Sequence, residues 1–216
     1  MKNIEILEKT NEYIVCIKPA GVLSEDTSGG MPSLLSDGDK KPLVVHRLDR
    51  EVSGVMVFAN DNKTAGKLSK EIADKSFNKE YLAVVEGDIG KGSSLEDLLF
   101  YDKTKNKTYV VNKERKGVKK ASLEFIKLAS GETENGTVSL VKIKLHTGRT
   151  HQIRVQFASR KHPILGDRKY GSSVKCQAAL FSHKISFNLN GENHEFKALP
   201  ENIYPWSLFD KALLMI

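Results

Sequence analysis

Residues 44–59, VVHRLDREVSGVMVFA, place a polar turn between two apolar runs. Asp49 lies in this turn between Arg47 and Arg50. A nearby positive charge favours the ionised form of a carboxylate, and an ionised carboxylate can act as a nucleophile. The turn therefore predicts a reactive carboxylate, with a surface ion pair at a bend as the alternative interpretation.

The apolar runs around the turn predict two strands, over residues 43–45 and 55–59. Asp49 is then expected on a loop held by strands, where catalytic groups are commonly presented. Residues 31–41 contain Pro32 and Gly38 and predict a loop.

The rest of the chain predicts an α+β protein. Further strands are expected at residues 14–17, 81–85, 122–128, 137–145 and 177–189. Helices are expected over 61–77, capped by Asp61, over 150–160, capped by Thr150, and from Pro205 near the C-terminus. Many strands with few helices, not in strict alternation, indicate a largely antiparallel sheet.

Helical spacing also predicts which side chains of residues 150–160 share a face. Ile153 and Phe157 are four residues apart, and His151 and Arg154 are three apart. We therefore expect an apolar face carrying the first pair and a second face carrying the other.

Five segments, in this order along the chain, resemble the RluA family of pseudouridine synthases. They are YIVCIKPAG at 13–21, HRLD at 46–49 followed by Ser53-Gly54, KEY at 79–81, GRTHQIRVQ at 148–156 and HPILGDRKY at 162–170. The family usually has threonine where this chain has Val52, an exchange between two β-branched side chains of similar shape.

The resemblance implies an RNA-modifying isomerase with no cofactor and no metal. The expected fold is a mixed, mostly antiparallel sheet with a central catalytic cleft and flanking helices, in a single catalytic domain over residues 1–216. Asp49 corresponds to the catalytic aspartate of the family, Tyr81 to the tyrosine beside the base, and Arg154 to the ion-pair partner of the aspartate. For Arg154, an RNA phosphate or a surface acid is the alternative partner.

The same resemblance implies a set of substrate-binding residues. Arg47 would displace the target base from its stack, with a simple ion pair to Glu51 or Asp49 as the alternative. His46 would orient the loop by hydrogen bonding, and Leu165 would form an apolar wall of the pocket. The candidates for phosphate contacts are Arg149, Arg168 and Lys169, with solvated surface charge as the alternative.

The net charge of +7 is unevenly distributed along the sequence. Residues 141–184 contain ten basic and one acidic side chain, residues 103–120 contain eight and one, and the remaining residues are net acidic. This separation suits a face that binds RNA phosphates. Solvated, lysine-rich loops are the alternative interpretation for 103–120.

Other functional classes fit the sequence less well. A hydrolase that releases uracil would use two carboxylates, for which Asp49 and Asp167 are available, and an RNA-binding protein without activity would need only the basic segments. The spacings of His146, His151 and His162 match no common metal site. The N-terminal residues resemble neither a signal peptide nor a membrane span.

From these features we expect a cytoplasmic monomer without an appended N-terminal RNA-binding domain. Its partner would be ribosomal or transfer RNA, and the sequence does not distinguish between the two. It also leaves open whether Asp49 attacks the ribose C1′, attacks the base, or assists elimination to a glycal.

Overall fold

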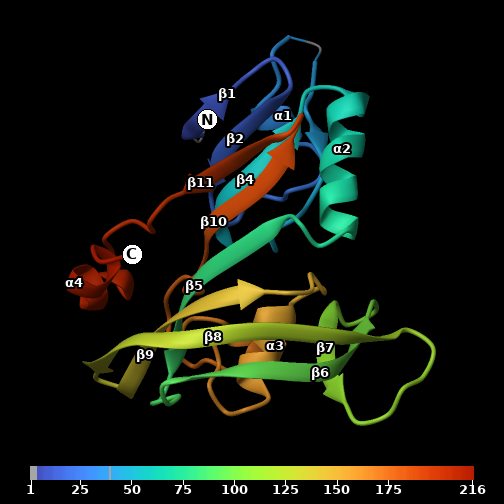
Figure 1. Ribbon diagram of the computed structural model, residues 1–216. Helices are drawn as coiled ribbons and strands as arrows, with labels where there is room; N and C mark the ends of the chain where they lie inside the picture. Colours follow the sequence, from blue (N-terminus) through green and yellow to red (C-terminus); the bar gives the residue numbers. More distant parts are fainter. Residues whose placement is uncertain (1–3, 39) are drawn as a thin grey trace. The chain divides into compact units, whose positions relative to one another are not determined.

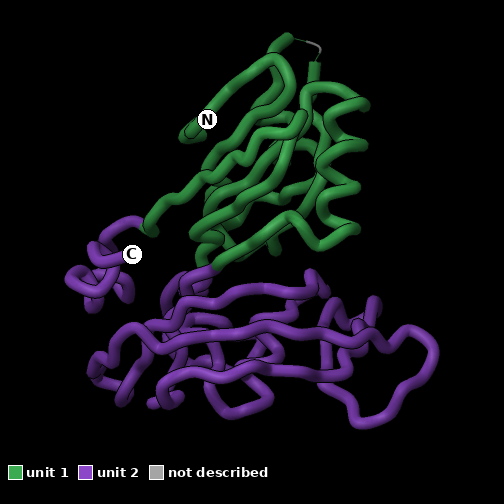
Figure 2. Tube along the Cα trace, in the orientation of Figure 1, with its two compact units in different colours: residues 1–80, 181–200 green, residues 81–180, 201–216 purple. Residues whose placement is uncertain are grey.

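The computed structural model describes residues 4–38 and 40–216 and divides the chain into two compact units (Figure 2). Unit 1 comprises Met1–Glu80 and Phe181–Pro200, and unit 2 comprises Tyr81–Leu180 and Glu201–Ile216. The first three residues of the N-terminal segment lie outside the described residues. The single domain expected from the sequence stays a prediction, and each unit is described by itself.

Unit 1 is built on a sheet (Figure 1), and the loop that carries Asp49 connects two of its strands, β3 and β4. Its strands are β1 (Ile6–Lys9), β2 (Tyr13–Lys18), β3 (Leu43–Val44), β4 (Ser53–Ala59), β10 (Leu180–Leu189) and β11 (Glu192–Lys197). They lie in the order β1-β2-β4-β10-β11, with β3 also paired to β4. All these pairings are antiparallel except the parallel pairing of β4 with β10.

The helix predicted after β4 covers the core of unit 1. Helix α2 (Asn62–Ala73) begins at Asp61, whose side chain accepts a hydrogen bond from the Thr64 N–H at 2.8 Å, as predicted. Its apolar residues pack on a cluster in which Phe187 is fully buried. Phe187 stacks on Phe77 at a centroid distance of 5.6 Å and meets Tyr13 edge-on at 5.7 Å. These aromatic contacts add to the stabilisation that burial supplies.

Unit 2 contains the remaining strands and the helix that carries Arg154 (Figure 1). Its strands are β5 (Asn78–Glu86), which begins in unit 1, β6 (Gly92–Asp102), β7 (Lys107–Val111), β8 (Val118–Thr133) and β9 (Gly136–Leu145). They follow the order β5-β9-β8-β6-β7. Its helices are α3 (Gln152–Ala158), the 3-10 helices η1 (Arg168–Tyr170) and η2 (Trp206–Phe209), and α4 (Asp210–Leu213).

The predicted strands and helices are present, but several other segments differ from their prediction. Residues 103–120, expected as basic loops, contain β7 and the start of β8, because Thr108 alternates with more exposed neighbours and is itself buried. Residues 31–41, expected as a loop, contain the single turn α1 (Met31–Leu34), which Pro32 in its first turn favours. Strands β1, β6 and β11 were missed because charged residues interrupt their apolar pattern.

No helix in the described part of the chain has both the length and the apolar character needed to cross a membrane. Every helix longer than one turn instead lies against a sheet, as α2 does in unit 1 and α3 does in unit 2 (Figure 1).

Gly54, the second residue of β4, lies where the backbones of β4 and β10 approach each other closely. Its φ is +123°, and a Cβ atom at this position would lie 2.4 Å from the carbonyl oxygen of Ser182. We expect Gly54→Ala to lower the free energy of unfolding by at least about 1–3 kcal/mol, because overpacking displaces backbone. Urea denaturation would measure the loss.

Gly66→Ala is the matched control, because a Cβ at Gly66 in α2 meets open space. Alanine there should raise the free energy of unfolding by up to about 1 kcal/mol. Equal stability changes in the two variants would contradict the close-approach explanation.

Candidate active site

The loop carrying Asp49, residues 46–52, is attached to the turn after β2 through a buried lysine. Lys18 is fully buried, and its Nζ donates to the carbonyl oxygens of Pro19 at 3.0 Å, Val22 at 2.8 Å and Arg50 at 3.3 Å. A buried ammonium group is tolerated only when acceptors replace its hydration. Lys18 therefore joins two segments that the sequence separates by about thirty residues.

Further hydrogen bonds fix the residues on both sides of Asp49. Ser24 Oγ donates to the Leu48 carbonyl at 2.8 Å and accepts from the Leu48 N–H at 3.1 Å. The Gly21 N–H donates to the Arg50 carbonyl at 2.8 Å, and Arg50 Nε donates to the Gly21 carbonyl at 3.1 Å. Arg50, to which the sequence assigned no role, therefore helps to fix the loop. The half-buried Asp49 lies between Leu48 and Arg50, both of which are fixed by hydrogen bonds.

His46 is a buried, neutral part of the same loop. Its Nε2 accepts a hydrogen bond from the Val57 N–H at 3.2 Å, and its ring lies 5.2 Å from that of Phe77. Burial, together with the positive charge of Lys79, holds the pKa of His46 well below 6.5. Because Nε2 is an acceptor, the single ring proton is on Nδ1.

Arg47 points to the surface and pairs with an acid that the sequence did not suggest. Its Nη1 lies 2.5 Å from Oε1 of Glu25, and both side chains are solvent-exposed. The acid in this ion pair is thus neither Asp49 nor Glu51, the two partners considered from the sequence. An exposed ion pair contributes little stability, so Arg47 can exchange Glu25 for another anion at small cost.

Arg154 in unit 2 forms a buried, bidentate ion pair with Asp167. Nε lies 2.6 Å from Oδ2, and Nη2 lies 2.8 Å from Oδ1. The Arg154 guanidinium carbon also lies 5.1 Å from the ring centre of Tyr170. A bidentate pair fixes the plane of the guanidinium. The sequence placed Asp167 in a motif, but nothing in its spacing identified it as the partner of Arg154.

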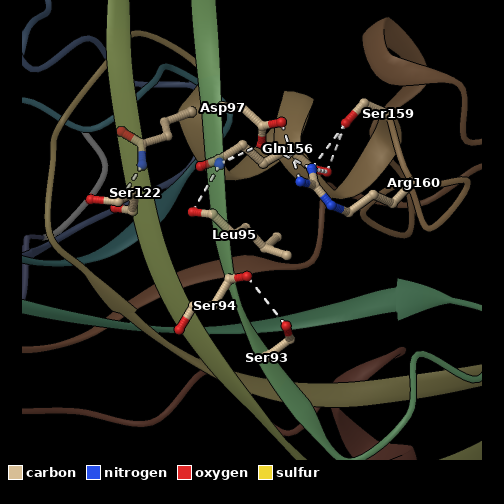
Figure 3. Close-up of polar contacts among 9 residues, drawn as sticks. Ser93, Ser94, Leu95, Asp97, Ser122, Gln156, Ser159 and Arg160 are labelled. Atoms are coloured by element: carbon tan, nitrogen blue, oxygen red, sulfur yellow. Dashed lines mark hydrogen bonds and ion pairs between the residues drawn. The ribbon is translucent and has the colours of Figure 1, made fainter.

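The opposite side of α3 is held by a second polar network (Figure 3). Gln156 Nε2 donates to Asp97 Oδ2 at 2.7 Å and to the Leu95 carbonyl at 3.4 Å. Arg160 binds both carboxylate oxygens of Asp97, with Nη1 at 2.9 Å and Nη2 at 3.2 Å. The helix that carries Arg154 is therefore tied to β6 independently of Asp167.

The start of α3 differs from the predicted cap. His151, not Thr150, occupies the N-cap position, with a left-handed φ of +54° and no side-chain cap bond. The His151 side chain instead contacts Tyr170, with Nδ1 2.9 Å from the hydroxyl oxygen. The prediction that His151 and Arg154 share a face is confirmed, since both contact Tyr170.

The remaining predicted site residues lie in unit 2, in different settings. Tyr81 on β5 and Leu165 are buried, and the Leu165 N–H donates to the Val84 carbonyl at 2.9 Å. Arg168 and Lys169 are exposed on η1. Arg149 is also exposed, and its Nε donates to the Lys120 carbonyl at 3.1 Å.

Hydrogen bonds join the two basic segments of the sequence within unit 2. Lys169 Nζ donates to the Asn106 carbonyl at 3.0 Å, and the Thr108 N–H donates to the Tyr170 hydroxyl at 2.8 Å. The Arg149 bond to Lys120 makes a third link. We define the basic face as six exposed cations at or near these links; they are Lys103, Lys105, Lys120, Arg149, Arg168 and Lys169.

The chain resembles one family over most of its length. A sequence profile described as RNA pseudouridylate synthase matches residues 12–159. The chain is 34% identical over 218 residues to ribosomal large subunit pseudouridine synthase D of Borreliella burgdorferi, covering 92% of this chain and 65% of that protein. It is 32% identical over 184 residues to tRNA pseudouridine synthase C of Haemophilus ducreyi, covering 78% and 74%.

A third relative, from Aquifex aeolicus, is named an uncharacterized RNA pseudouridine synthase and is 34% identical over 182 residues. The match covers 78% of this chain but only 56% of that protein. The structure of human RNA pseudouridylate synthase domain containing 1 superimposes with a TM-score of 0.83 at 22% identity, covering 96% of this chain and 86% of that one. The predicted fold class is thereby confirmed.

The neutral His46 predicts how stability depends on pH. Its pKa is lower in the folded state than the ordinary value of 6.5, so the unfolded chain binds the extra proton more readily. We expect the contribution of His46 to the free energy of unfolding to fall by up to about 1.4 kcal/mol per pH unit as the pH drops below about 6.5. Chemical denaturation from pH 7.5 to 5 would measure it.

His46→Gln is the comparison variant because glutamine does not titrate. The difference in unfolding free energy between the wild type and this variant should change with pH below 6.5 and level off above it. A difference independent of pH across this range would show that His46 does not titrate on unfolding as described.

Proposed function

Because the chain belongs to the RNA pseudouridylate synthase family, we propose that it converts uridine in RNA to pseudouridine, with Asp49 as the catalytic carboxylate. The observation that carries the proposal is the match over residues 12–159, which includes Asp49, Tyr81 and Arg154. The attachment of the Asp49 loop by Lys18 and Ser24 supports it, because a catalytic group must be held in position.

The proposed reaction rearranges bonds within one nucleotide. The bond from N1 of the base to C1′ of the ribose breaks, a bond from C5 to C1′ forms, C5 loses its proton and N1 gains one. No atoms need to enter from a cofactor. Asp49 would attack C1′, attack the base or assist elimination to a glycal, and Tyr81 would stack on the base and take part in removing the C5 proton.

Arg154 would be the basic group of the reaction, the role that the resemblance implies for it. Arg47 would leave Glu25 and enter the stack as the target base flips out, at a cost of roughly a few kcal/mol for a stacked base. The exposed position of the Arg47–Glu25 pair supports this exchange. We further propose that Leu165 forms an apolar wall of the pocket and that His46 keeps the loop in place.

The basic face would bind RNA phosphates next to the target nucleotide. Arg149 and Lys169 donate to backbone carbonyls, which hold these cations in place without neutralising their charge. Exposed Arg168 would add a third phosphate contact beside Lys169. Ribosomal and transfer RNA, the substrates in the names of two relatives, are both candidates. We propose a cytoplasmic monomer that acts without a cofactor.

The alternative functions are less well supported. A hydrolase with Asp49 and Asp167 as its two carboxylates would need Asp167 available, yet both Asp167 oxygens bind Arg154. A binding protein without activity would need the basic face, but it would not need an Asp49 loop fixed by hydrogen bonds to Lys18 and Ser24.

The proposed function is tested by incubating the protein with unmodified total RNA and mapping pseudouridine by carbodiimide treatment and primer extension. We expect product with the wild type and none detectable with Asp49→Ala, because the reaction loses its carboxylate. Glu51→Gln is the matched control, since it removes an exposed carboxylate from the same loop and should keep activity.

Each outcome of this experiment discriminates between functions. No product from the wild type on any RNA would overturn the proposed activity, and equal product from Asp49→Ala would overturn the role of Asp49. RNA binding without product would indicate a binding protein. Release of uracil would indicate a hydrolase.

The basic face predicts the salt dependence of RNA binding. Replacing both Arg168 and Lys169 by alanine should weaken binding, because fewer phosphates are then neutralised. The slope of log affinity against log salt should become shallower by about 0.7 for each single-strand phosphate that the variant no longer neutralises. Filter binding at several salt concentrations would measure the slope.

The control variant replaces Lys9 and Lys41 of unit 1 by alanine, which changes the net charge equally. These lysines pair with Asp37 and Asp26, so we expect the slope to stay at the wild-type value. Equal slopes in the two double variants would show that net charge, and not the basic face, sets the affinity.

A further inference from the structure

We propose that Asp167 and Tyr170 are positioning residues that set the orientation of the Arg154 guanidinium in the reaction. The inference rests on the proposed function, because it concerns the orientation of Arg154, to which that function gives a part in the reaction. Neither residue is proposed to touch the substrate.

The geometry of the ion pair leaves Arg154 one defined orientation. Asp167 binds the edge of the guanidinium formed by Nε and Nη2, at 2.6 and 2.8 Å. Both side chains are nearly fully buried, with 6% and 2% of their surface exposed. Because the guanidinium is planar, this contact also fixes the direction of Nη1, which lies away from the Asp167 edge.

Tyr170 restrains the same guanidinium from its face. The guanidinium carbon Cζ of Arg154 lies 5.1 Å from the centre of the Tyr170 ring, within the range of a cation–π contact. The ring itself is anchored at its hydroxyl, which accepts from the Thr108 N–H at 2.8 Å and lies 2.9 Å from His151 Nδ1. Burial raises the pKa of Tyr170 to about 12, so the hydroxyl keeps its proton for this contact.

Attachment of α3 alone does not account for this arrangement. The helix is already joined to β6 by Asp97, which binds Gln156 and Arg160 (Figure 3). A nearly fully buried ion pair such as Arg154–Asp167 is costly to desolvate, and apolar residues of similar volume often stabilise a protein equally well. The Arg154–Asp167 pair is therefore explained better by a requirement for an oriented cation than by a requirement for stability.

The chain offers a matched control for the test. Asp167→Asn removes a carboxylate that pairs with an arginine of α3. Asp97→Asn removes a carboxylate that pairs with Arg160, just after α3, and leaves the surroundings of Arg154 intact. Tyr170→Phe keeps the ring and removes the hydroxyl anchor. Rates are measured in single turnover with excess enzyme, at a temperature where every variant is folded, by release of tritium from RNA labelled at C5 of uridine.

We expect Asp167→Asn to slow the chemical step by about 10- to 100-fold, because a displacement of ~1 Å in a site can cost about 100-fold. Tyr170→Phe should slow it less, and RNA affinity should change little in either variant. Asp97→Asn should lower the melting temperature while its rate stays close to that of the wild type. Equal slowing by Asp97→Asn and Asp167→Asn would overturn the proposal.

A double-mutant cycle separates positioning from independent effects. If Asp167 acts through Arg154, then Asp167→Asn should slow the reaction little further once Arg154 has been replaced by lysine, which cannot form the bidentate pair. Multiplicative losses in the double variant would contradict an action through Arg154.

A measurement that needs no activity distinguishes failure of this inference from failure of the proposed function. The Arg154 Nε–H, followed by ¹⁵N NMR, should exchange slowly with solvent in the wild type and in Asp97→Asn, and fast in Asp167→Asn. Equally slow exchange in Asp167→Asn would overturn the positioning role. Wild-type protein without pseudouridine product would overturn the proposed function, and the exchange rates would still decide whether Asp167 holds Arg154.

Discussion

The structure around Asp49 depends on the buried ammonium group of Lys18. Its three carbonyl partners come from the turn after β2 and from Arg50, so one cation fixes the distance between two loops. Replacing the lysine by an apolar residue would leave those carbonyls without a charged donor, and the cost of burying unsatisfied polar groups would fall on the Asp49 loop. Ser24 and Gly21 can bond the loop closely because Lys18 has already brought the two segments together.

Two arginines with proposed roles in the reaction are held by different physical means. Arg47 is paired with Glu25 at the surface, where solvent weakens the attraction and the partner can be exchanged. Arg154 is paired with Asp167 in the interior, where removing one partner strands a charge and exchange is costly. The proposed roles fit these arrangements, because a residue that enters a base stack must leave its partner, whereas a cation that must keep one orientation must not.

The sequence predicts the parts of the fold that depend on local patterning. Strands β2, β4 and β9 and helix α2 follow from runs of apolar residues, alternation and a capping aspartate. Strand β7 was missed because Lys107 and the lysines before and after the strand suggested solvated loops, although the apolar part of a lysine side chain can pack on a sheet while its ammonium group reaches water. The burial of Lys18 and the pairing of Arg154 with Asp167 could not be predicted, since lysine is almost never fully buried and the pairing depends on a turn of unknown geometry.

The uneven charge of the sequence gains a physical meaning once partners are assigned. In unit 1, lysines such as Lys9, Lys41 and Lys184 are paired with acids, so their charges are largely compensated. On the basic face of unit 2, Arg149 and Lys169 instead bind carbonyl oxygens, which position a cation without neutralising it. A fixed cation that keeps its charge loses little conformational entropy when a phosphate arrives, so it gains more from that contact than a mobile or paired lysine would. The distinction between these two sets of cations therefore lies in what each is bound to, a carboxylate or a carbonyl oxygen, and not in the number of basic residues.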